Sequence, residues 1–252
     1  MRKIISQNEY FNYYRNSIDN VSHWYPKIKD CGVNVPNTII FKLSNFMIKW
    51  LLPDDKQKSL NRIIRYTKRH VIKELRQNGM SFLYIKDGII YDRFNFGFVI
   101  ANNTFDIAMK IFNTFWFDKE HNYQGITELV ISDFIGLDSY VSDNFCFTNK
   151  LPLRPSFKIL YDFDKNEIVG IYNPWIKEFV SNEIKNVNNN IVYEEAYPYL
   201  EGIYSNYKDD VRKELIEKLK DVDLYGRWLI NVLYNEDDGK LWITKMKSTY
   251  KI

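Results

Sequence analysis

Residues 151–175, with the sequence LPLRPSFKILYDFDKNEIVGIYNPW, constrain the fold more than any other part of the chain. Residues 156–163 are mainly apolar or aromatic, residues 164–167 form a short polar stretch, and residues 168–172 are again apolar. Two such runs on either side of a short turn are typical of a β-hairpin. The fold must therefore include an antiparallel sheet that contains this hairpin.

Hydrophobic periodicity predicts further elements on both sides of the hairpin. Strands are expected at residues 38–41, 81–86, 93–99, 128–135, 228–234 and 240–244, with Asp238-Gly239 in the turn between the last two. Helices are expected at residues 7–20, 54–78, 104–117 and 207–222, with Thr104 as an N-cap and with Pro26 as an interruption after the first helix. The mixture of hairpins and helices predicts an α+β fold.

The composition is that of a folded protein with an almost balanced charge. Of the 252 residues, 45% are hydrophobic and 17% aromatic, and the 35 basic and 32 acidic residues leave a net charge of +3. This charge does not by itself indicate a nucleic-acid or membrane partner. Two cysteines without a CxxC motif, and no run of roughly 18 apolar residues, predict a cytoplasmic protein with reduced thiols.

The predicted helix at residues 54–78 carries a basic stripe on the face opposite its apolar residues. The stripe consists of Arg62, Arg65, Arg69, Lys73 and Arg76. It can be a surface for nucleic acid or an acidic partner, or simply a solvated helix face. Because Glu74, Asp54 and Asp55 are close in sequence, we expect a solvated face and no nucleic-acid partner.

Four segments, in this order, resemble proteins of the ATP-grasp superfamily, of the diverged kind found in phages and bacteria. They are residues 24–41, residues 82–96, residues 127–136 together with 151–164, and residues 228–246. The resemblance implies an ATP-grasp-like fold in which two α/β lobes enclose a nucleotide cleft. It implies an N-terminal α/β segment at residues 1–78, a small lobe at 79–135 and a large lobe at 136–252.

The resemblance also implies a nucleotide site with ATP and Mg²⁺ as cofactors. Lys86 and Arg93 match basic residues that contact the phosphates in this superfamily. Asp133 stands where a glutamate usually binds the ribose hydroxyls, and the backbone near Ile135 would pair with adenine. From the residues alone, Lys86, Arg93 and Asp133 can equally be exposed charges on strands.

The positions that would perform the chemistry are largely substituted. Arg154 matches a residue that would contact an acyl phosphate or a substrate carboxylate, and Lys158 stands where arginine is usual. Asn231 stands at the first metal-binding acid, and Thr244 or Lys245 stands at the second. Magnesium prefers carboxylate oxygens, so Asn231 offers only a weak ligand.

These substitutions predict a diverged, catalytically inactive protein that binds a nucleotide or a protein partner. One alternative is an active ATP-dependent carboxylate–amine ligase that uses an acyl phosphate, with Asp133 and Asp162 as replacement metal ligands. Another is a nucleic-acid-binding protein that uses the basic helix. No Ser/His/Asp set with recognisable spacing is present, which argues against a hydrolase.

Overall fold

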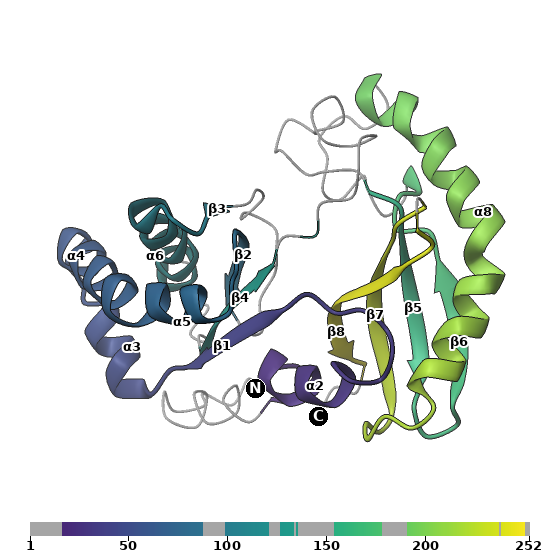
Figure 1. Ribbon diagram of the computed structural model, residues 1–252, viewed down its shortest axis with the longest axis horizontal. Helices are drawn as coiled ribbons and strands as arrows, with labels where there is room; N and C mark the ends of the chain where they lie inside the picture. Colours follow the sequence, from purple (N-terminus) through teal and green to yellow (C-terminus); the bar gives the residue numbers. More distant parts are fainter. Residues whose placement is uncertain are drawn as a thin grey trace, which may run out of the picture. The chain divides into compact units, whose positions relative to one another are not determined.

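The chain forms two compact units in the computed structural model (Figure 1). The model describes residues 17–87, 99–120, 127–133, 135, 154–177, 191–236 and 238–249. The first unit comprises Met1–His23 and Asn37–Phe134, and the second comprises Trp24–Pro36 and Ile135–Ile252. The expected boundary after residue 78 does not separate these units, whereas the expected boundary after residue 135 lies one residue from the end of the first unit.

A four-stranded antiparallel sheet explains why residues 37–78 belong to the first unit. Its strands, in the order β1-β4-β2-β3, are Thr38–Lys42, Glu128–Asp133, Phe82–Asp87 and Val99–Ile100. The first strand, β1, pairs along its whole length with β4, so that Thr38 lies opposite Ser132 and Lys42 opposite Glu128. Of the residues expected to form an N-terminal segment, β1 therefore belongs to this sheet, whereas Trp24–Pro36 belongs to the second unit.

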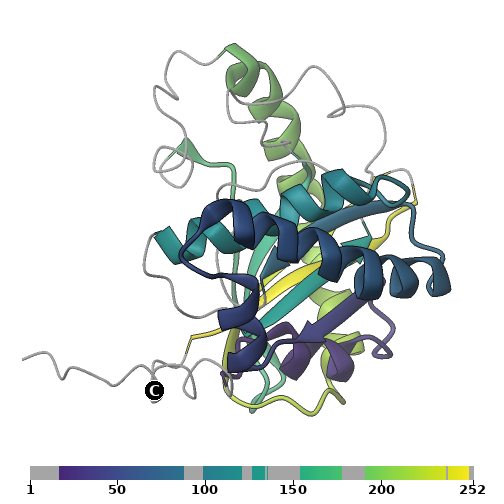
Figure 2. The ribbon, with the colours of Figure 1, turned by 90° about the vertical axis from the view of Figure 1, so that its left-hand side faces the viewer.

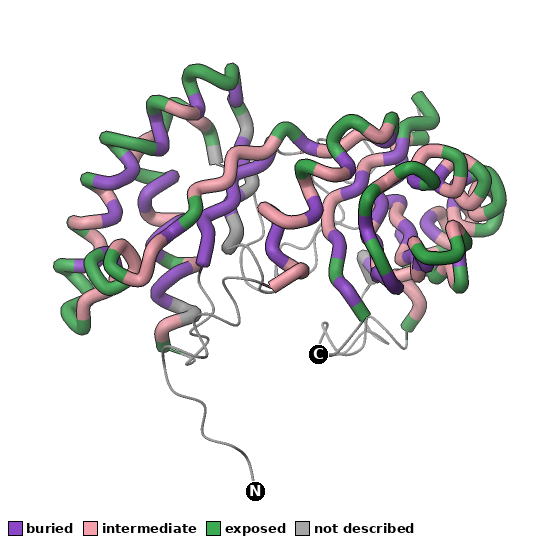
Figure 3. Tube along the Cα trace, turned by 90° about the horizontal axis from the view of Figure 1, so that it is seen from below, coloured by how far each residue is buried: buried purple, intermediate pink, exposed green. Residues whose placement is uncertain are grey.

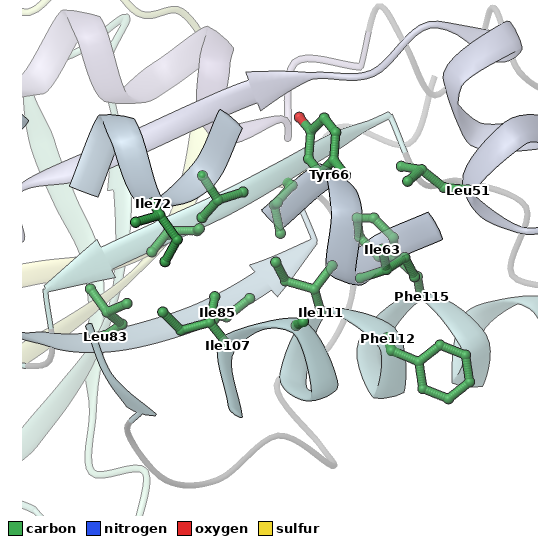
Figure 4. Packing of buried hydrophobic residues seen from close by; sticks show 14 of the residues in the cluster. Leu51, Ile63, Tyr66, Ile72, Leu83, Ile85, Ile107, Ile111, Phe112 and Phe115 are labelled. Carbon is green, nitrogen blue, oxygen red and sulfur yellow. The ribbon is translucent and has the colours of Figure 1, made fainter. Parts of the chain in front are cut away.

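Helices cover this sheet and enclose a single apolar core. They are α3 (Asn45–Leu51), α4 (Lys56–Tyr66), the π-helix η1 (Thr67–Val71), α5 (Ile72–Gln77) and α6 (Thr104–Glu120). Figure 4 shows Ile63 of α4, Ile85 of β2 and Ile111 of α6 meeting in this core, where all three are fully buried. Burial of these helix faces stabilises the unit, since each fully buried aliphatic side chain contributes about 1.5–3 kcal/mol.

Several helix ends differ from those expected. The predicted helix at residues 54–78 is α4, η1 and α5 in succession, with Asp55 as the N-cap. The α6 N-cap is Asn103 and not Thr104, because the Asn103 side chain accepts a hydrogen bond from the Asp106 N–H. The helix expected at residues 7–20 lies mostly outside the described residues. Pro26 does not interrupt the chain there but lies within α2 (Val21–Ile28).

The second unit contains the predicted hairpins, joined in one antiparallel sheet. The strand order is β6-β5-β7-β8, with β5 at Ser156–Asp162, β6 at Glu167–Tyr172, β7 at Arg227–Tyr234 and β8 at Leu241–Ser248. Helix α8 (Ile191–Leu219) packs against β5 and β6 (Figure 1). The side chains that alternate toward the core, such as Ile159, Ile230 and Ile243, are fully buried.

Helix α8 is longer than the predicted helix at residues 207–222, because its first half was missed. Pro198 lies within the helix and obscures the helical pattern in the sequence. Buried residues nevertheless recur every three or four positions from Tyr193 to Ile203 and again from Val211 to Leu219, with the partly buried Tyr207 between the two runs. They include Tyr193, Ala196, Leu200, Ile203, Val211, Leu215 and Leu219. The first run passes Pro198 without a break, and this apolar face explains why the helix extends through the proline.

Two further sequence expectations concern membranes and thiols. Among the described helices, none combines the length and the apolar composition that crossing a bilayer requires. Cys31 carries a free thiol whose pKa is raised by partial burial. Cys146 lies outside the described residues.

Candidate functional site

One face of the second sheet is left partly exposed. Because side chains alternate along a strand, the residues between the buried ones share the opposite face. On this face β5 contributes Ser156, Lys158 and Leu160, β7 contributes Leu229, Asn231 and Leu233, and β8 contributes Trp242, Lys245 and Lys247. We call this surface the open face. It combines apolar side chains with three lysines, which is suited to a ligand with both an apolar and an anionic part.

The strand register brings two of the lysines into one row with Asn231. Lys158 of β5 lies opposite Asn231 of β7, and Asn231 lies opposite Lys245 of β8. Side chains directly opposite each other in antiparallel strands have Cβ atoms about 5 Å apart. The row therefore presents one neutral amide between two ammonium groups.

A bulge and an aromatic residue define the two ends of this row. The register between β7 and β8 shifts at Asn231, and the Thr244 hydroxyl donates a hydrogen bond to the Asn231 carbonyl at 3.3 Å. At the other end, Tyr172 of β6 lies opposite Lys158. The Tyr172 phenol folds back over Gly170, where a Cβ atom would overlap it. Gly170 thus makes room for an aromatic ring beside the row of lysines.

The residues of this row do not fit a magnesium ion. Magnesium requires anionic oxygen ligands in octahedral geometry, whereas Lys158 and Lys245 present positive charges on both sides of Asn231. Throughout the described ranges, no three His, Cys, Asp or Glu side chains are grouped so that they could hold a metal ion. The geometry thus gives no support to a metal-binding role for Asn231.

Asp162, one of the expected replacement metal ligands, has a structural role in the hairpin. Its carboxylate accepts a hydrogen bond from the Arg227 side chain at 2.9 Å and others from the backbone N–H groups of Asp164 and Lys165. The hydrogen bond from Arg227 is the main reason that the pKa of Asp162 lies below its usual value. These hydrogen bonds occupy the carboxylate and stabilise the turn between β5 and β6.

Arg154 is held at the start of β5 by a chain of hydrogen bonds. Its guanidinium donates to the Ile135 carbonyl at 2.6 Å, and its own carbonyl accepts from the Trp175 indole at 2.6 Å. The Trp175 backbone N–H donates to the Asn173 side-chain oxygen at 2.9 Å, and the Asn173 side-chain amide donates to the Glu201 carboxylate of α8 at 2.5 Å. Arg154 and Ile135, both expected site residues, are therefore brought together.

Asn173 and Glu201 were not predicted to act together. Asn173 is only 4% exposed, and the Glu201 carboxylate also accepts hydrogen bonds from Tyr197 and Ser205. The signal in the sequence was a lone asparagine directly after an apolar strand, since a buried amide requires partners. The partner on α8 lies 28 positions further along the chain, so that it was not identifiable without the fold.

The remaining expected residues belong to the first unit. Asp133 ends β4, and burial raises the pKa of its carboxyl group, although a hydrogen bond from the Asn37 side chain opposes this shift. Lys86 lies in β2 opposite Val130, but its side chain is outside the described part of the structure. Arg93 also lies outside the described residues. Their roles toward phosphates and ribose stay predictions.

Comparisons with known proteins bear on the fold. The chain is similar to C-terminally truncated Cdc123 from Schizosaccharomyces pombe, with a TM-score of 0.50 and 11% identity over 98% of this chain and 87% of that chain. Another structure of Cdc123 from S. pombe gives a TM-score of 0.47, with the same identity and coverage. N5-carboxyaminoimidazole synthetase from Staphylococcus aureus, complexed with ADP, gives 0.44 and 10% identity over 98% and 52% of the two chains.

The chain has an ATP-grasp-like fold, as the resemblance implied. No protein-family model and no curated protein matches the sequence. At 11% identity the structural likeness establishes the fold alone. The function must be argued from the residues of this chain.

Proposed function

We propose that this chain is a diverged ATP-grasp-like protein that binds the phosphates of a nucleotide without magnesium, and that it acts by binding instead of catalysing a ligation. The observation that carries the proposal is the row of Lys158, Asn231 and Lys245 on the open face. In this row Asn231 and Lys245 stand at positions where a magnesium-dependent enzyme of this kind needs carboxylates.

The electrostatics of the row favour an anion. Two ammonium groups on neighbouring strands attract phosphate oxygens through charge-assisted hydrogen bonds, and the rigid sheet holds them in place. Catalysis of phosphoryl transfer requires more, because bound metal ions bridge the phosphates and neutralise the charge that develops in the transition state. Fixed lysines can bind the ground state of a nucleotide without supplying that bridge.

The other expected residues also receive roles, each within its own unit. Lys86, Arg93 and Asp133 belong to the first unit, and the roles that the resemblance implies for them toward phosphates and ribose are proposed for that unit by itself. The backbone near Ile135 pairs with the base. Arg154 fixes this segment through its hydrogen bond to the Ile135 carbonyl, and so acts as a positioning residue.

Calorimetric titration of the full chain with ATP in EDTA tests the role of the row. We expect the Lys245→Ala variant to bind ATP at least about tenfold more weakly, because a hydrogen bond to a charged group contributes about 1.5–3 kcal/mol and 1.4 kcal/mol corresponds to about tenfold. Lys213→Ala is the matched control, since Lys213 is exposed on α8 and does not belong to the open face. Equal affinities of Lys245→Ala and the wild type would contradict the assignment.

Turnover of ATP distinguishes the ligase alternative from the proposed binding function. Incubation with Mg-ATP and a panel of carboxylic acids and amines should release no ADP above the level of a protein-free control. ADP release that disappears in a Lys86→Ala variant would overturn the inactive assignment and establish the ligase. A protein partner would be compatible with either result and is tested separately by co-purification.

A further inference from the structure

The first unit carries a concentration of positive charge that the proposed function does not use. Helices α4, η1 and α5 cover residues 56–77, which contain eight Lys or Arg residues and a single acidic residue, Glu74. Their net charge is thus +7, whereas that of the whole chain is +3. The remaining 230 residues together are therefore negative, at −4. The near-balance of the whole chain conceals a strong local asymmetry.

Most of these basic residues lie on one face of the helices, which we call the basic face. It consists of Lys58, Arg62, Arg65, Arg69, Lys73 and Arg76, spaced three or four positions apart. All except Arg62 are exposed, and Arg62 is partly exposed. With a rise of about 1.5 Å per residue, the helices extend the face over roughly 30 Å. Figure 2 shows α4, η1 and α5 following one another across the first unit.

The two acidic residues that directly precede α4 do not neutralise the basic face. Asp54 forms an ion pair with Lys119 of α6 at 3.0 Å, and the Asp55 carboxylate caps α4 by accepting the Lys58 N–H at 2.8 Å. None of the ion pairs found among the described residues involves Lys58, Arg65, Arg69, Lys73 or Arg76. Asp54 and Asp55 were two of the reasons to expect a solvated face, and neither pairs with a side chain of the basic face.

Two aromatic side chains of α3 continue this surface beyond Arg62. The Arg62 guanidinium lies 5.5 Å from the centre of the Trp50 ring and donates a hydrogen bond to the Trp50 carbonyl at 2.6 Å. Phe46 lies one helical turn before Trp50, and so on the same face of α3. The side chains of Phe46 and Trp50 are 78% and 37% exposed. Exposed aromatic rings beside a line of cations are typical of surfaces on which nucleic-acid bases stack.

We propose that the basic face, together with Phe46 and Trp50, binds single-stranded nucleic acid. Regularly repeated cations complement a backbone with regularly repeated phosphates, and the aromatic pair offers rings for unpaired bases. An anionic membrane is the weaker alternative, because insertion into a bilayer requires an apolar helix face. The apolar face of these helices, including Ile63, Val71 and Leu75, is instead buried in the core of the unit. Figure 3 shows buried and exposed positions alternating along the described helices.

Fluorescence anisotropy of the full chain with a labelled 20-nucleotide RNA of mixed sequence, titrated at several salt concentrations, tests the proposal. We compare Arg65→Gln/Arg69→Gln/Lys73→Gln/Arg76→Gln with Lys29→Gln/Lys165→Gln/Lys213→Gln/Lys220→Gln. Both variants lose four charges, and the control residues are exposed in the second unit. Circular dichroism and melting curves verify that each variant is folded.

The basic-face variant should bind the RNA at least tenfold more weakly, and its salt dependence should be shallower by about 3 in the slope of log K against log salt. The control should bind like the wild type. A Phe46→Ala variant should bind the single strand about tenfold more weakly without a change in slope, because it removes stacking alone. Equal losses in both quadruple variants would overturn the proposal, as would binding of phosphatidylserine vesicles or poly-glutamate in the absence of RNA binding.

Discussion

Replacing Asn173 with alanine should destabilise the second unit by more than the loss of one hydrogen bond, because the amide makes two. The side chain is buried and bonds both to the Trp175 N–H and to the Glu201 carboxylate. Its loss leaves a backbone N–H without an acceptor, which costs about 1–3 kcal/mol, and removes a hydrogen bond to a charged group, which contributes about 1.5–3 kcal/mol. We therefore expect the free energy of unfolding to fall by about 3 kcal/mol.

The assay is thermal unfolding followed by circular dichroism and by tryptophan fluorescence. For a chain of this size 1 kcal/mol corresponds to about 2–4 °C, so that the Tm of the second unit should fall by about 6–12 °C. Tyr197→Phe should have a smaller effect, because it removes only one 3.2 Å hydrogen bond to the same carboxylate. Asn206→Ala is the control, since Asn206 is exposed on α8 and alanine favours a helix.

The result that would refute this reasoning is a Tm of Asn173→Ala within about 2 °C of that of the wild type. Such a result would mean that the hydrogen bonds between Asn173 and its neighbours contribute no net stability. The role assigned to Arg154 would then lose its support, because the same chain of hydrogen bonds holds the Arg154 carbonyl through Trp175.

Three further predictions concern stability. Burial raises the pKa of Glu128 above its ordinary 4.5, despite a hydrogen bond from Ser22, so that the wild type should lose stability relative to Glu128→Gln as the pH rises from about 4 to 7 in urea titrations. Burial also raises the pKa of Tyr66 from 10.0 to about 12, so that the wild type should lose stability as the pH rises between these two values. The Tyr66→Phe variant, which has no group to ionise there, should lose less. Gly170→Ala should cost about 1 kcal/mol in the wild type and less in a Tyr172→Ala background, because the three atoms nearest to the added methyl group all belong to Tyr172; equal costs in both backgrounds would disprove this contact.

Elements with a strong local pattern were predictable from the sequence. The hairpin of β5 and β6 and the helix α6 have uninterrupted patterns, and the structure confirms both. Helix α3 was missed because seven residues contain too few turns to show a period. The first half of α8 was missed because Pro198 argued against a helix that tertiary packing nevertheless stabilises.

The arrangement of the site depends on contacts between distant parts of the chain. The resemblance identified Asn231 and Lys245 one by one, but the position of Lys158 opposite Asn231 depends on the pairing of β5 with β7. Lys247 was not singled out, although the same register places it on the open face. Strand order and register arise from the whole fold, so that the row of charges could not be assembled from local patterns.

The central claim is that positive charges on the open face replace the metal. The most direct test is the affinity for ATP as a function of magnesium concentration, measured for the wild type and for an Asn231→Asp/Lys245→Asp variant. We predict that magnesium leaves the affinity of the wild type unchanged or weakens it, and that it strengthens binding to the variant, whose two carboxylates lie opposite each other in the register. Wild-type binding that requires magnesium would contradict the account.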